Sequence, residues 1–154
     1  MEKAIGANKL ITAHNQGVLC TNSVKHKGYP FGSVTPYALD ENGRLVFLIS
    51  RMAVHTKNLE VDPRASLLVS EESQAAGLLG GARANVMGTI GRVPVDETGA
   101  ARAAYLGQHP AAEQWASFGD FNFYRMDVAE IYYVGGFGVM GWVSTADYQQ
   151  AAQS

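Results

Sequence analysis

The chain has 154 residues, of which 47% are hydrophobic and only 17% are charged, with a formal net charge of −2. That length predicts one domain with a real core, spanning 1–154. No segment concentrates Lys or Arg, and no apolar run approaches the ~20 residues of a membrane span, so neither a nucleic-acid partner nor a membrane is expected. The single Cys20 and the lack of a signal-peptide pattern predict a cytoplasmic protein.

The first third of the chain predicts one helix followed by short strands. The expected elements are a helix within residues 2–15 and strands at 18–21, 31–39 and 45–49. Pro36 cannot donate to a β-ladder, so its strand needs an edge, a bulge or a break at that point. The segment Asp40–Gly43 is a hairpin turn, because its Asn-Gly pair readily adopts positive φ angles.

The rest of the chain predicts further strands with helices between them. Ser50 is expected to cap a helix that ends at Asp62-Pro63. Later strands are expected at 65–69, at 85–93 with a bulge at Gly88 or Gly91, over 122–133 as one bent strand or two, and at 139–143. A loop is expected at 71–81 and a turn at 135–138. Helices are expected at 99–108 and 109–117, with a frayed helix from Thr145. Six or seven short strands of this kind favour a mainly β fold, a small antiparallel barrel with peripheral helices.

Polar residues gather on the strand–helix–strand unit between Gly28 and Val69. The strand residues are Ser33, Thr35, Tyr37 and Ser50, and the helix residues are His55, Thr56, Lys57 and Asn58. Such a cluster near a helix start suggests a pocket for a polar or anionic small molecule. The alternative is that Ser50 is only a helix cap and His55 packs at a sheet–helix junction.

No catalytic or metal-binding motif stands out elsewhere. None of the four histidines lies at a metal-binding spacing with another His or Cys, so no metal site is expected. There is no Gly-x-Ser-x-Gly elbow, and Asp120 is most simply a turn or cap residue. Any chemistry is therefore expected to come from a bound cofactor.

The ordered motifs resemble a known superfamily. They are Gly17–Thr21, Gly28–Tyr37, Leu48–Ser50, Ala53–Leu59, Asp62–Leu68, Gly107–Pro110, Phe118–Phe121 and Gly135–Gly138. Together, over about residues 8–148, they are similar to the pyridoxamine 5′-phosphate oxidase-like FMN-binding split-barrel superfamily, and most resemble its haem-utilisation (HugZ-type) and CREG-like branch. The resemblance implies a six-stranded antiparallel split β-barrel and a homodimer with FMN sites at the subunit interface.

The resemblance also implies which residues hold the flavin. The phosphate would be bound by Ser33, Val34, Thr35, Ser50, His55, Thr56 and Lys57, with Asn58 nearby. The ring would lie against backbone near Pro36 and Tyr37, and Trp142 of the other subunit would close the site. The oxidase itself carries cations at positions that are Gly32, Tyr37, Val54 and His55 here, so pyridoxamine phosphate oxidation is not expected.

Three functions follow as hypotheses. The first is an FMN-dependent oxidoreductase of unknown substrate. The second is a haem-binding or haem-degrading protein, with His14, His26 or His109 as the axial ligand of the iron. The third is a non-enzymatic split-barrel scaffold that binds no cofactor.

Overall fold

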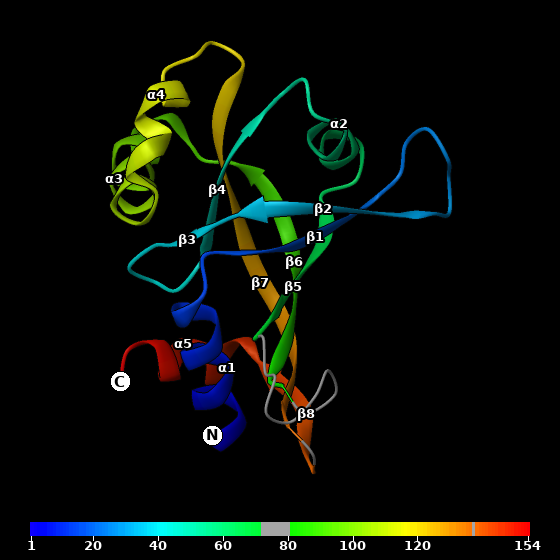
Figure 1. The fold of residues 1–154 in the computed structure, drawn as a ribbon, viewed down its shortest axis with the longest axis vertical. Helices are drawn as coiled ribbons and strands as arrows, with labels where there is room; N and C mark the ends of the chain where they lie inside the picture. Colours follow the sequence, from blue (N-terminus) through cyan, green and yellow to red (C-terminus); the bar gives the residue numbers. More distant parts are fainter. Residues whose placement is uncertain (72–80, 137) are drawn as a thin grey trace.

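The computed structural model describes residues 1–71, 81–136 and 138–154, and within them a single antiparallel sheet is surrounded by short helices (Figure 1). The strands are β1 (Gln16–Asn22), β2 (Pro30–Pro36), β3 (Ala38–Leu39), β4 (Leu45–Ser50), β5 (Arg64–Ser70), β6 (Arg83–Arg92), β7 (Phe121–Gly136) and β8 (Val139–Ser144). The helices are α1 (Glu2–Ala13), α2 (Val54–Val61), α3 (Thr98–Gln108), α4 (Glu113–Ala116) and α5 (Thr145–Ala152), with 3₁₀ turns η1 (Val95–Glu97) and η2 (Pro110–Ala112). Most of the expected loop at 71–81, and Phe137 of the expected turn, lie outside the described residues.

The sheet curls, and its two outermost strands are directly connected by the chain. The strand order is β2-β1-β5-β6-β7-β4-β3, with β8 paired to β7. The outermost strands, β2 and β3, are consecutive in sequence and are separated only by Tyr37. Pro36 ends the edge strand β2, where its missing N–H costs no ladder bond. The mainly β, antiparallel split-barrel prediction is therefore confirmed. The described residues form eight strands instead of the six that the resemblance implies, and one of the additional strands arises because the strand expected at 31–39 divides at Pro36-Tyr37.

Strand β4 is buried on both faces, as its continuous apolar sequence predicted. Leu45, Phe47 and Ile49 point into the main core, which α1 and α5 cover at one end of the sheet (Figure 1). Val46 and Leu48 point the other way, into a second cluster formed with α3 and the short α4. The strand thus joins two apolar clusters and cannot be solvated on either side.

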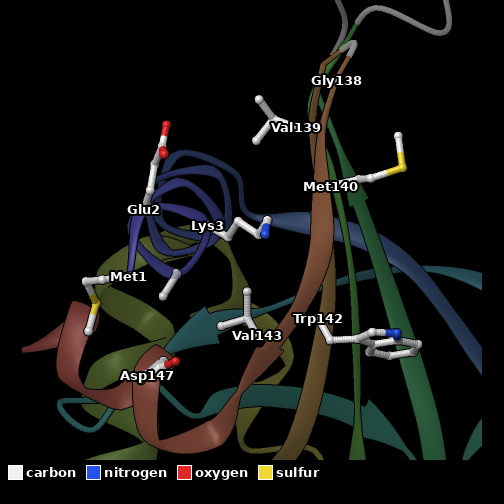
Figure 2. Close-up of a pocket in the computed structure, with 10 residues that line it drawn as sticks. Met1, Glu2, Lys3, Gly138, Val139, Met140, Trp142, Val143 and Asp147 are labelled. Atoms are coloured by element: carbon white, nitrogen blue, oxygen red, sulfur yellow. The ribbon is translucent and has the colours of Figure 1, made fainter.

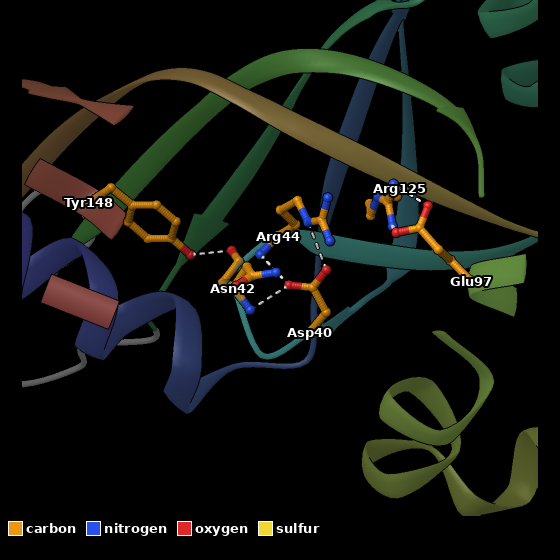
Figure 3. Close-up of polar contacts among 7 residues, drawn as sticks. Asp40, Asn42, Arg44, Glu97, Arg125 and Tyr148 are labelled. Carbon is orange, nitrogen blue, oxygen red and sulfur yellow. Dashed lines mark hydrogen bonds and ion pairs between the residues drawn. The ribbon is translucent and has the colours of Figure 1, made fainter. Parts of the chain in front are cut away.

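Buried tyrosines fix the ends of the barrel. Tyr37 is fully buried and its hydroxyl donates to the carbonyl of Ile11, at 2.6 Å. Tyr148 of α5 donates to the carbonyl of Gly43 in the β3–β4 turn, at 2.8 Å (Figure 3). Ser144 caps α5 by accepting from the N–H of Asp147. The expectation of a frayed C-terminal helix was wrong, because Tyr148 anchors this helix in the core.

We expect this burial to make the protein lose stability above pH 10. Burial raises the pKa of Tyr105 to about 12 and raises the pKa values of Tyr37 and Tyr148 further above their ordinary value. An unfolded tyrosine ionises near pH ~10, so this stabilisation is complete below that pH and is lost as the pH rises toward the folded values. Tyrosinate absorbance, recorded beside circular dichroism, should show these three side chains ionising only as the fold is lost. Ionisation of every tyrosine near pH ~10 with the fold intact would contradict the assignment.

Candidate functional site

Ser50 lies in the cluster predicted to bind phosphate, but it does not cap α2. The helix begins after Ala53, which caps it without a side-chain bond. The Ser50 hydroxyl donates to the Asp120 carboxylate at 2.8 Å and accepts from the N–H of Met52 at 3.1 Å. The cap prediction was wrong because Arg51–Ala53 form a turn between strand and helix, which moves the helix start beyond the reach of Ser50.

Other members of the cluster use their polar groups to hold the fold together. Thr35 donates to the carbonyl of Ser33, and the buried Thr56 donates to the carbonyl of Ser50 at 2.6 Å. The buried Asn58 donates to the hydroxyl of Thr21 and accepts from the N–H of Val24, both at 3.0 Å. These bonds fasten α2 to β4, β1 and the loop that follows β1. A phosphate bound here would have to replace several of them, and at Ser50 it would face the charge of Asp120.

His55 is the exception, since its Nε2 is buried without a hydrogen-bond partner within the described ranges. Burial also lowers the pKa of His55, which favours the neutral imidazole in the chain without a ligand. A neutral ring offers a phosphate at most one N–H and no charge. Lys57 supplies a cation to this cluster from the exposed face of α2. Charge-assisted bonds are the strong ones, so the cluster is poorly equipped for a dianion.

The remaining predicted residues divide between the core and the outer face of the sheet. Tyr37 is buried as described, so its ring packs in the core. Val34 and Pro36 lie on the outer side of β2, where Val34 is 69% exposed. Trp142 is 58% exposed and packs edge-to-face on Tyr132 with ring centroids 5.0 Å apart. Met140 and Trp142 project from β8 on the side opposite to α1 and Lys3 (Figure 2).

Strand register aligns these outer side chains into a continuous line, here called the outer row. From β2 to β8 it consists of Val34, Val18, Leu68, Asn85, Tyr132 and Trp142, each paired in register with the next. Every member except Asn85 is apolar or aromatic. Contiguous apolar surface of this kind marks an interaction or ligand site more often than isolated exposed side chains do.

Cavities hollow the same face beside the outer row. One of about 500 Å³ is lined by His14, Gln16, Gly17, Val18, Val34, Leu68, Ser70 and Glu71. Another of about 560 Å³ is lined by Cys20, Thr21, Asn22, Pro30, Arg64, Ala65, Ser66, Met87, Gly88, Thr89 and Ala129. A third, of about 480 Å³, lies between the start of α1 and β8, on the α1 side of that strand and so away from the outer row (Figure 2). Each is large enough for a small ligand.

The three histidines considered as haem ligands occupy different surroundings. His14 lines the first of these cavities, and its Nδ1 lies 2.8 Å from the carbonyl of Leu10. His109 places Nε2 2.7 Å from the carbonyl of Tyr37 and stacks at 4.7 Å on the ring of Tyr105. His26 is exposed in the loop between β1 and β2.

The described part of the chain contains neither a pre-formed metal site nor a helix that could span a membrane. No three His, Cys, Asp or Glu side chains there come together as a metal ion would require. No helix there is both long and apolar enough to cross a membrane.

The curled sheet, whose outermost strands are connected at Tyr37, defines a split-barrel protein. Comparison with known proteins identifies its family. Residues 1–150 match the family described as CREG, beta-barrel, and the chain belongs to this family, as the motifs suggested. The unconventional chloroplastic haem oxygenase HOZ of Arabidopsis thaliana is 37% identical over 139 residues, which are 88% of this chain and 42% of that protein.

Two solved structures share this fold. The haem-binding protein of Mycobacterium smegmatis is 33% identical, with a TM-score of 0.89 over 96% of this chain and 60% of that chain. An FAD-binding protein of Mesorhizobium loti, 20% identical, shares the fold with a TM-score of 0.67 over 83% of this chain and 89% of that one. The chain thus spans less than two thirds of the length of both HOZ and the M. smegmatis protein.

Proposed function

We propose that this chain binds haem on the outer face of its sheet, at the interface of a homodimer. The observation that carries the proposal is the outer row, which exposes apolar side chains beside a cavity that contains a histidine. Relatives named as a haem oxygenase and a haem-binding protein support it.

The chemistry of the outer face suits a large flat apolar ligand. Small-molecule sites are lined mainly by apolar and aromatic side chains with a few polar groups that fix orientation. Val18, Val34 and Leu68 supply such a wall, and His14 supplies a nitrogen donor within the same cavity. Bound haem would contribute the redox and oxygen chemistry of its iron. The part of this chain is to hold the porphyrin and to exclude water from one of its faces.

A second copy of the chain would cover what the ligand leaves exposed. Val34 and Trp142 are both more than half exposed although they lie on one sheet face. Leaving several large apolar groups in water is unfavourable, and two-fold dimers cover such a patch with the same patch of the partner. The low charged fraction of the chain, 17%, is consistent with a covered face.

FMN is the second candidate, and one observation favours it. Nε2 of His55 is buried without a hydrogen-bond partner among the described residues, and His55 belongs to the set that the resemblance associates with the flavin phosphate. Against it stand the neutral imidazole of His55 and the carboxylate of Asp120 beside Ser50. FMN-dependent oxidation therefore ranks below haem binding.

Parallel titrations of the purified protein with haemin and FMN should separate these functions. We expect a saturable Soret shift with a Kd of roughly 1 μM for haemin. FMN should give no saturation of flavin fluorescence quenching up to about 50 μM, because the phosphate cluster is short of cations. Saturation by FMN without haemin binding would favour the flavin protein. Binding of neither would contradict both and leave the non-enzymatic scaffold.

A further inference from the structure

We infer that His14 is the axial ligand of the haem iron, bound through Nε2 from the cavity beside the outer row. This inference rests on the proposed haem function and assigns its coordinating residue. Its experiment can fail while that function stands.

The position of His14 follows from the junction between α1 and β1. It is the residue at which the helix ends, with φ −115° and ψ 163°, so the chain turns there from helical to extended backbone. The side chain folds back on the last turn, where the Leu10 carbonyl is one of those that a helix end leaves without a helical partner. The two atoms are 2.8 Å apart.

This bond determines which ring nitrogen is free to coordinate iron. A carbonyl oxygen can only accept, so Nδ1 of His14 must carry the proton and donate. In the neutral ring the lone pair is then on Nε2. Histidines that ligate metals commonly donate their other N–H to a carbonyl in this way, which fixes the ring and raises its basicity. The ring is thus prepared by the helix itself, before any ligand arrives.

The cavity around His14 combines apolar side chains with the polar Gln16, Ser70 and Glu71. Val18 is paired in register with both Val34 and Leu68, so three strands present adjacent apolar side chains to the cavity. Among the described residues, the lining includes the carboxylate of Glu71, whose Oε1 accepts from the N–H of Ala82 at 3.0 Å.

Neither of the other two histidines combines these features. His109 also has one nitrogen on a carbonyl, but its ring is stacked on Tyr105 within the packing against α3. His26 lies in a hollow of about 330 Å³ with Tyr29, Pro30 and Phe31, on a loop outside the sheet. Of the three, His14 combines a tautomer fixed by the helix with a cavity that includes three apolar members of the outer row.

The test is a haemin titration of the wild type, His14→Ala, His14→Gln and the matched control His26→Gln. We expect both His14 variants to bind haemin at least ~10-fold more weakly and to lose the histidine-ligand pattern in electron paramagnetic resonance and resonance Raman spectra. His26→Gln should match the wild type in both. Thermal melts establish that each variant is folded, and His14→Gln can retain a side-chain donor for the Leu10 carbonyl if His14→Ala is unstable.

Rescue separates coordination from a structural role. In His14→Gly, added imidazole should restore the wild-type Soret position and ligand spectrum, which a merely structural defect would not allow. Wild-type affinity and spectra in the His14 variants would overturn the assignment while leaving haem binding intact. Failure of the wild type to bind haemin would overturn the proposed function as well, so the two failures are distinguishable.

Discussion

Replacement of Val34 by aspartate is expected to weaken the homodimer by at least ~100-fold, equivalent to about 2.7 kcal/mol. Val34 stands at the β2 end of the outer row and is 69% exposed, so the single chain should tolerate the change. In the proposed dimer the partner covers this position, and a carboxylate buried there without a counter-charge is costly. Sedimentation or light scattering over a range of protein concentrations measures the effect.

Val95→Asp is the matched control for this experiment. Val95 is 94% exposed on η1, away from the outer row, and receives the same change of residue. It should leave the association constant unchanged. A Val34→Asp protein that remains as dimeric as the wild type would show that the outer row is not the interface. A monomeric wild type would refute the dimer itself.

Gly88→Ala is expected to lower the free energy of unfolding by about 3 kcal/mol or more. Gly88 lies at the bulge where β6 changes register against β7. A Cβ added there would lie 2.2 Å from the carbonyl oxygen of Asp127 and 2.9 Å from the side chain of Met126. The first of these atoms belongs to the backbone of the paired strand, so the methyl group fits only if the two strands separate.

Gly91→Ala, three residues along the same strand, provides the control. An added Cβ there meets no atom within 4 Å, so its effect on stability should stay within about 0.5 kcal/mol. Chemical denaturation of both variants measures the difference. Equal stability of the two variants would contradict the role assigned to the bulge.

Much of the fold could be predicted because its signals are local. The turn at Asp40–Gly43 forms where expected, but of the Asn-Gly pair only Gly43 has a positive φ, +75°, and Asn42 does not. Helix α2 ends at Asp62-Pro63, and the glycine in β6 marks a bulge. Each of these features depends on a few neighbouring residues whose backbone preferences are strong.

The candidate site could be predicted only in part, because its contacts join distant segments. Ser50 looked like a helix cap, but its hydroxyl is taken by Asp120, 70 residues later. Asn58 looked available for a ligand, but both ends of its amide are bonded to β1 and the loop after it. Nothing in the local pattern of either residue indicates its partner.

The sequence by itself determined the mainly β class, the order and approximate ends of its elements, and the family resemblance. Only the tertiary structure decided how the sheet curls about Tyr37 and which side chains form the outer row. It also decided that His14, Val34 and Leu68 line the same cavity. The physical reason is register. The alternation of residues within one strand predicts which side chains share a face of the sheet. Which side chains on that face become neighbours depends on the register between paired strands, and the register is set by burial of the other face in the core.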